Sequence, residues 1–155
     1  MGAIMRFYSV LKSREGKPID FKKIEKNVKE ICKKFEISLF YIYGSYVKGN
    51  PWKMSDIDLA YLSEKNLSWE EESKLREYLE ENFEDEAIDL VNLKNAPLTL
   101  IHRVLKEGRC LYASDLKTKI DFETRKESEY FETEWMRKEY FERMIKKIEN
   151  GSIWD

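Results

Sequence analysis

The sequence predicts one α/β or α+β domain with a mixed central β-sheet, helices on its faces and a long helix at its C-terminal end. Short runs rich in β-branched and aromatic residues alternate with longer segments in which apolar residues recur every three or four positions. This alternation is typical of a sheet covered by helices. The chain has 155 residues, of which 42% are hydrophobic. That is enough for one domain with its own core and no disulfide or structural metal.

The first predicted elements are a helix and a buried strand. Residues 1–18 are mostly polar and predict an irregular N-terminal extension. Asp20 is a suitable N-cap for a helix over residues 20–35. The apolar stripe of this helix consists of Phe21, Ile24, Val28, Ile31, Cys32 and Phe35. Residues 37–43 are β-branched and aromatic and stop at Gly44, so they predict a buried strand.

A second strand, a helix and a third strand follow. After a turn containing Gly49, Asn50 and Pro51, residues 56–62 predict a strand. Residues 68–71 form a capping box, which opens a helix. The inward-facing residues of this helix are Leu75, Leu79 and Phe83. Residues 87–93 alternate apolar and polar side chains and predict the third strand.

The remaining elements end in a long helical segment. Pro97 suits the first turn of a helix that stops at Gly108, and residues 109–113 predict a fourth strand. The buried stripe expected for that helix is Leu98, Ile101 and Leu105. From 114 to about 150 the chain is predicted to be helical, with a second stripe made of Met136, Tyr140, Phe141, Met144, Ile145 and Ile148. We therefore divide the chain into a core over 19–113 and a helical extension over 114–155 that packs on the core or on a partner.

Composition excludes several classes of function. There are 28 basic and 30 acidic residues and a net charge of -2, so no global positive field supports general nucleic-acid binding. Cys32 and Cys110 lie far apart in apolar runs, which is typical of reduced core thiols. The apolar stretch 37–47 is too short to span a bilayer, and the start lacks the apolar region of a signal peptide. We expect a cytoplasmic protein without membrane contact.

One arrangement of residues points to chemistry. Gly44 and Ser45 end the first strand, and after ten intervening residues Asp56 and Asp58 begin the second. Residues two apart in a strand point to the same face, so these aspartates present adjacent carboxylates while Ile57 enters the core. Such a pair repels itself and calls for a cation. Magnesium is the natural choice, because it binds through one or two carboxylates and shares its other positions with water and phosphates.

Four further features of the chain bear on this site. Gly44 allows backbone to approach a ligand, and Ser45 with the following amides can donate to phosphate oxygens at a helix start. Lys48 adds a positive charge. Asp89 is a third carboxylate, in the strand 87–93, placed to complete a metal site or to accept a proton. The competing interpretations are solvent-facing acids at these positions, and for His102, the one histidine, an ordinary packed or surface residue.

The segments GSYVKG and SDIDL resemble the signature of the DNA polymerase beta superfamily of nucleotidyltransferases, in its minimal (MNT) branch, and AIDLVNL resembles the strand of that family's third acid. The resemblance implies a nucleotidyltransferase-like mixed sheet. It also implies that Asp56 and Asp58 bind magnesium, with two ions, and that Asp89 is the third acid. Gly44 and Ser45 would hold the triphosphate of ATP. Lys48 stands where these proteins commonly have arginine.

The same resemblance implies a function and a partner. Minimal nucleotidyltransferases are often antitoxins that silence a HEPN-domain ribonuclease toxin by adding AMP to a tyrosine. The expected activity is therefore magnesium-dependent transfer of a nucleoside monophosphate, AMP from ATP, to a hydroxyl. The alternative is a non-catalytic antitoxin that masks its partner through the helical surface. Transfer to a small hydroxylated molecule is disfavoured, because a chain of 155 residues has little room for a second substrate domain. Whether the protein forms homo-oligomers stays open.

Overall fold

The structure is a computed structural model, and it describes residues 20–47, 56–83 and 87–152. The predicted N-terminal extension and Lys48 lie outside the described residues. The elements in chain order are α2 (Phe21–Lys34), β1 (Ile37–Tyr43), β2 (Ile57–Ser63), α3 (Trp69–Asn82), β3 (Ile88–Asn92), α4 (Leu98–Glu107), β4 (Arg109–Ala113), α5 (Leu116–Glu132) and α6 (Glu134–Glu149). The four predicted strands and the helices before residue 114 are confirmed to within a residue or two at their ends.

The four strands form one mixed sheet in the order β3-β2-β1-β4. The central strand β1 is antiparallel to β2 and to β4, whereas β2 and β3 are parallel. Parallel neighbours need a crossover, and α3 provides it. This topology places the end of β1 beside the starts of β2 and β3.

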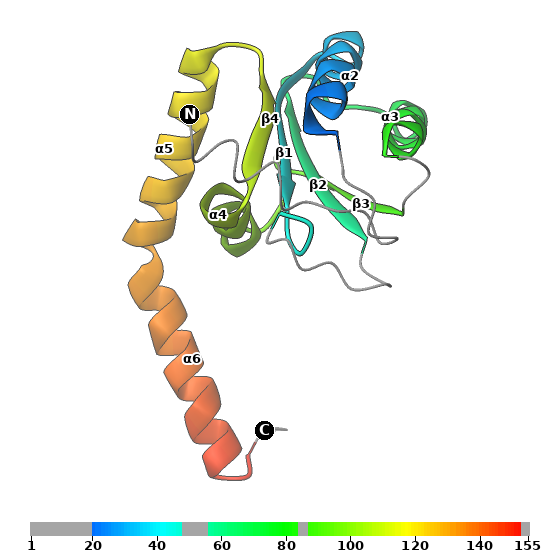
Figure 1. Cartoon of the computed structure of the whole chain (residues 1–155). Coiled ribbons are helices and arrows are strands. Elements are labelled where there is room, and N and C mark those ends of the chain that lie inside the picture. The colour runs from blue at the N-terminus through cyan, green and yellow to red at the C-terminus, as the bar shows by residue number, and fades with distance from the viewer. Residues whose placement is uncertain (1–19, 48–55, 84–86, 153–155) are drawn as a thin grey trace.

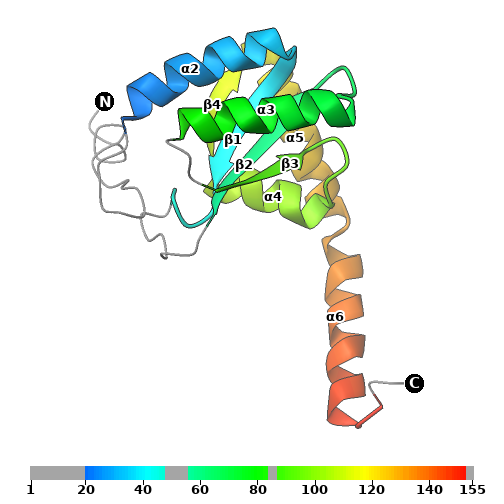
Figure 2. The ribbon, with the colours of Figure 1, turned by 90° about the vertical axis from the view of Figure 1, so that its right-hand side faces the viewer.

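Helices cover both faces of the sheet (Figures 1 and 2). On one face α2 and α3 bury a cluster that includes Val28, Leu59 and Leu79. On the other face α4 and α5 cover a second cluster, which includes Tyr41 and Phe122. Each buried large apolar side chain contributes roughly 1.5–3 kcal/mol to folding. Alternate residues of β1 enter the two clusters, which explains why the whole strand is buried.

The helix starts follow the capping residues in the sequence. The side chain of Asp20 accepts a hydrogen bond from the backbone N of Lys23 at 3.2 Å, and Ser68 accepts one from Glu71 N at 3.1 Å. These bonds satisfy amides that have no partner within the helix. The predicted caps of α2 and α3 are therefore confirmed.

The buried side of α4 differs from the prediction. Its buried residues are Ile101 and Val104, whereas Leu98 and Leu105 are only half buried. The helix is short, so a shift of one position in the stripe is compatible with the same spacing. Gly108 ends the helix, as predicted.

The single C-terminal helix predicted from residue 114 is divided into α5 and α6 at Thr133. The Thr133 hydroxyl donates to the carbonyl oxygen of Glu129 at 2.7 Å, a local bond of the kind that bends helices. Phe122 of α5 packs into the core. No residue of α6 is buried, and Figure 1 shows α6 continuing beyond the domain.

None of the described helices is long and apolar enough to cross a membrane.

Candidate active site

Gly44 ends β1 in a conformation that favours glycine. Its φ is +79°, and a Cβ built at this position would lie 2.0 Å from Oδ2 of Asp58. An L-amino acid side chain here would be strained by the backbone angle and would also collide with the carboxylate. Gly44 is thus what allows the start of β2 to place Asp58 against the end of β1.

A short turn follows this glycine. The backbone N–H of Val47 donates to the carbonyl oxygen of Gly44 at 3.2 Å. Ser45 lies in the turn and is half buried, whereas Tyr46 is buried. The described part of this segment is a turn and not a helix, and the continuation that would show a helix start lies outside the described residues.

Asp58 is placed between two other candidate residues. It lies opposite Tyr43 across the antiparallel pair and opposite Asp89 across the parallel pair. Its neighbours Ile57 and Leu59 enter the core on the α2 and α3 face. Asp58 is half buried, whereas Asp89 is exposed at the rim of the sheet. The structure thus brings two of the three predicted carboxylates to adjacent sheet positions.

Asp56 lies just before β2 and is exposed. The backbone N–H of the next residue, Ile57, donates to the carbonyl oxygen of Ala87 at 2.9 Å, which fixes the start of the strand. The negative charge of Asp56 contributes to the electrostatics of Asp58. Asp56, Asp58 and Asp89 therefore form one group, which we call the acidic edge. Asp56 lies on its solvent side.

The carboxyl group of Asp58 resists ionisation. Burial raises its pKa above the usual value, the negative charge of Asp89 raises it further, and Asp56 adds to the effect. Burial and the same two carboxylates of Asp58 and Asp89 raise the pKa of Tyr43 to about 12. A cation bound at this edge would relieve this repulsion.

A positive side chain that the sequence analysis missed stands beside these groups. The guanidinium carbon of Arg103, on α4, lies 6.0 Å from the centre of the Tyr43 ring. Its charge lowers the pKa of both Asp58 and Tyr43, against the larger raising effects. Arg103 also pairs with Glu107 at 3.4 Å. In the sequence it is one polar residue of an amphipathic helix, so nothing marked it as a neighbour of the acidic edge.

The donor set suits magnesium only in part. Within residues 20–47, 56–83 and 87–152 there is no group of three or more His, Cys, Asp or Glu side chains that could hold a metal ion. Magnesium, however, needs only one or two carboxylates when substrate phosphates and water supply its other ligands. The crowded pair Asp58 and Asp89 fits that requirement, because burial and the charge of Asp89 raise the pKa of the Asp58 carboxyl.

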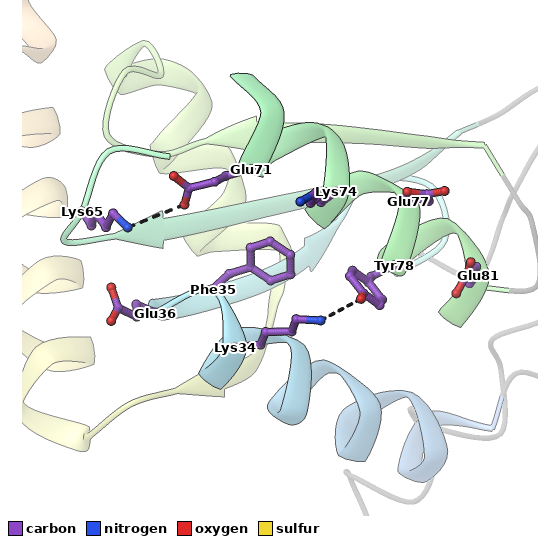
Figure 3. A pocket seen from close by; sticks show the side chains of 9 residues that line it. All are labelled: Lys34, Phe35, Glu36, Lys65, Glu71, Lys74, Glu77, Tyr78 and Glu81. Atoms are coloured by element: carbon purple, nitrogen blue, oxygen red, sulfur yellow. Dashed lines mark hydrogen bonds and ion pairs between the residues drawn. The ribbon is translucent and has the colours of Figure 1, made fainter. Parts of the chain in front are cut away.

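A hollow of about 570 Å³ lies elsewhere, between the end of α2 and α3 (Figure 3). It adjoins the start of β1, at the opposite end of the strand from Gly44. Inside it Lys34 Nζ donates to the hydroxyl of Tyr78 at 2.7 Å, and Lys65 pairs with Glu71 at 3.8 Å. The hollow lies at the other end of β1 from the acidic residues, and we assign it no role in the site.

The ring of His102 packs against α5. Its Nδ1 lies 3.0 Å from Oε1 of Glu127, and its ring stacks on Tyr130 with 3.6 Å between ring centres. The interpretation of His102 as a packed residue is confirmed, and its pairing with Glu127 was not predictable because the two residues lie 25 positions apart.

The chain is similar to known proteins over most of its described residues. Residues 6–117 match the family model described as polymerase beta, nucleotidyltransferase. Over 83 residues the chain is 34% identical to the protein adenylyltransferase MntA of Shewanella oneidensis. That alignment covers 51% of this chain and 56% of the relative, so it spans about half of the relative's length.

Solved structures show the same fold. A toxin-antitoxin structure with AMP-PNP has a TM-score of 0.67 at 24% identity, covering 78% of this chain and 98% of the matched one. A structure of the tri-AMPylated Shewanella oneidensis HEPN toxin in complex with its MNT antitoxin has a TM-score of 0.65 at 23% identity, covering 81% and 98%. At these identities the likeness establishes the architecture, whereas function has to be argued from the site.

Proposed function

This chain belongs to the polymerase beta nucleotidyltransferase family, and from that membership we propose that it transfers AMP from magnesium-bound ATP to a hydroxyl group of a protein. The observation that carries the proposal is the contact between Gly44 and Asp58 at the end of β1, with Asp89 at the adjacent position of β3. A glycine with positive φ, a half-buried carboxylate and a neighbouring carboxylate form an edge that favours a cation and its phosphate ligand.

In the proposed reaction one bond to phosphorus forms and one breaks. The acceptor's hydroxyl oxygen forms a bond to the α-phosphorus of ATP, the bond from that phosphorus to its bridging oxygen breaks, and pyrophosphate leaves with the electron pair. The hydroxyl proton passes to a carboxylate and then to water. Asp89 is exposed at the rim of the sheet, which suits proton exchange with solvent.

The residues of the acidic edge and of the turn after β1 would have different roles in binding. Asp56 and Asp58 would hold magnesium, with Asp89 acting either as a further ligand or as the proton acceptor. When bound, magnesium neutralises charge on the phosphate oxygens and on the departing pyrophosphate. Gly44 would let the backbone approach the triphosphate, and Ser45 would donate a hydrogen bond to the phosphate oxygens. Lys48 would add a positive charge beside the phosphates.

The relatives suggest the acceptor. The relative that shares 34% identity is named a protein adenylyltransferase, and a solved neighbour is described as an antitoxin in complex with an AMPylated HEPN toxin. We therefore propose a tyrosine of a HEPN-type toxin as the acceptor, and the role of antitoxin for this chain. We also propose that the reaction takes place in the cytoplasm, which the free thiols of Cys32 and Cys110 and the use of ATP support.

The test is label transfer. The full chain is incubated with α-labelled ATP, magnesium and the HEPN-domain protein of the same genome, in parallel with Asp58→Asn and with Asp121→Asn. Asp121 is an exposed aspartate of α5 and serves as the matched control. We expect wild type and Asp121→Asn to label the partner and Asp58→Asn to be at least about 100-fold slower, because a ligand of the cation is lost.

The non-catalytic alternative has a distinct outcome. The exposed apolar residues of α6 favour a protein contact that needs no chemistry. If Asp58→Asn inhibits the toxin as well as wild type does, masking is the function and transfer is not.

A further inference from the structure

The strongest feature outside the site is the apolar face of α6, which we define as Met136, Tyr140, Phe141, Ile145 and Ile148. Their exposed fractions are 53%, 66%, 65%, 39% and 56%. Phe141, Ile145 and Ile148 recur at steps of four and three residues and so lie on one side of the helix, which Tyr140 and Met136 extend around its flank. An isolated helix of this length is marginal in water, and an apolar stripe of this size is typical of an interaction surface.

A defined joint links α6 to the domain. The guanidinium of Arg137 lies 3.8 Å from the centre of the Tyr130 ring and donates to the Thr133 hydroxyl at 2.7 Å. The other side of the joint is the stack of Tyr130 on His102 of α4. Because this joint connects α4, α5 and α6, α6 is held in one direction and presents its apolar face in a fixed place.

A hollow of about 620 Å³ lies next to the joint, between α4 and the end of α5. Its lining includes the carboxylates Glu123, Glu127 and Glu134, with Lys106 as its lysine. His102 in the same hollow is already paired with Glu127. Glu123 also pairs with Lys119 at 3.1 Å, and Glu134 with Lys138 at 3.8 Å. With 48% of its side chain exposed, Glu134 is the most open of the three carboxylates, and it is the one that suits a basic side chain of a partner.

The hollow and the apolar face of α6 lie on one continuous side. Glu127, Tyr130 and Glu134 are followed at steps of seven, four and three residues by Phe141, Ile145 and Ile148. Such steps return to the same side of a helix, and Glu134, the first residue of α6, itself lines the hollow. The side of α6 that carries Phe141, Ile145 and Ile148 thus begins at the hollow, and α6 has no buried residue.

α6 extends toward the end of the sheet where the active site lies. Figures 1 and 2 show α6 extending past the sheet at the end where β1 terminates, which is the end that carries Gly44. A macromolecule lying along α6 would therefore stand beside the acidic edge, whereas one bound at α2 or α3 would not.

We propose that the hollow and the apolar face of α6 together form the docking surface for the protein acceptor. The docking element is an amphipathic helix of the acceptor that lies along Phe141 and Ile145 as α4 lies along α5, with a basic side chain directed into the hollow. The inference rests on the proposed transfer of AMP to a protein and adds where that protein binds.

The experiment separates docking from catalysis. The double variant Phe141→Ser/Ile145→Ser is compared with Trp135→Ser, since Trp135 is 63% exposed but lies about a third of a turn away from Phe141 by helical spacing. Binding of the HEPN-domain protein of the same genome is measured by calorimetry, binding of magnesium-ATP to the chain alone in the same way, and label transfer over a range of partner concentrations. Circular dichroism confirms that each variant is folded.

We expect the double variant to bind the partner about 100-fold more weakly, to keep its affinity for magnesium-ATP, and to recover the wild-type transfer rate at saturating partner. Trp135→Ser should behave as wild type. Unchanged partner binding in the double variant overturns the proposal, as does a wild-type chain that does not bind the partner. A wild-type homodimer that the double variant dissociates also overturns it, because a second copy then covers α6. If the partner binds through α6 but no label is transferred, the docking surface stands and the proposed function fails.

Discussion

The α-carbon of Gly44 lies directly against the carboxylate of Asp58, so that a Cβ at position 44 would be 2.0 Å from Oδ2. The contact joins the end of β1 to the start of β2 without an intervening side chain. It places a half-buried carboxylate beside the turn that follows β1. The position of Asp58 therefore depends on the absence of a side chain at residue 44.

We predict that Gly44→Ala removes most of the activity. The new Cβ must displace the Asp58 carboxylate, and the φ of +79° costs an L-amino acid roughly 1–2 kcal/mol. Label transfer should fall by about 100-fold or more, with a lower free energy of unfolding in urea. Gly151→Ala is the control, because Gly151 has φ +68° and nothing within 4 Å of its built Cβ. A loss of activity equal in both variants would attribute the effect to backbone strain alone.

Stability without metal should depend on pH through Asp58. Burial and the charge of Asp89 raise its pKa in the folded chain, so the folded state binds this proton more tightly than the unfolded state. Its contribution to stability is present below the ordinary carboxyl pKa and is lost as pH rises through the raised value. In EDTA at pH 7, Asp58→Asn should therefore melt about 2–4 °C above wild type. The difference should shrink at acidic pH, and parallel curves would contradict the assignment.

Magnesium should stabilise wild type more than it stabilises Asp58→Asn. A cation that binds the folded chain stabilises it, and the gain grows with its concentration relative to the dissociation constant. We expect magnesium to raise the Tm of wild type more than that of Asp58→Asn, measured by calorimetry at pH 7. Potassium chloride at matched ionic strength controls for general screening. Equal responses would place the ion elsewhere.

Arg103 should stabilise the acidic edge only while Asp58 is charged. Its guanidinium lies 6.0 Å from the Tyr43 ring and lowers the pKa of Asp58. In EDTA at pH 7, Arg103→Gln should destabilise wild type by roughly 0.2–1 kcal/mol, as expected for a solvent-screened charge. It should have little effect in the Asp58→Asn background. Arg125→Gln, which removes an exposed arginine of α5, should be neutral in both.

Much of the fold follows from local rules. The run 37–43 ends at a glycine, and it forms β1 with the predicted bounds. Ser68 and Asp20 cap helices where the sequence places them. These features depend on residues within one turn or one strand, so a single sequence contains the information needed to predict them.

What the sequence left undetermined depends on tertiary contacts. The approach of Arg103 to Tyr43 joins α4 to β1, which are separated by two strands and a helix in the chain. The division at Thr133 depends on a hydroxyl bond to Glu129, whereas the helical periodicity continues across it. The stripe on α6 was recognised, but periodicity is the same for a buried and an exposed stripe, so only the structure shows that α6 does not pack on the core.

The joint at Thr133 should control how well α6 presents its apolar face. The planar guanidinium of Arg137 both stacks on Tyr130 and donates to Thr133, which a lysine ammonium does not reproduce. Arg137→Lys should widen the range of α6 orientations and weaken partner binding about 10-fold, with magnesium-ATP affinity unchanged. Electron paramagnetic resonance distances between labels at Ser128→Cys and Glu142→Cys, in a Cys110→Ala background, measure that range. Arg143→Lys is the control, because Arg143 pairs only with Glu139 on the exposed side of the same helix among the interactions described. Identical distance distributions for Arg137→Lys and wild type would show that the direction of α6 is set by the backbone alone.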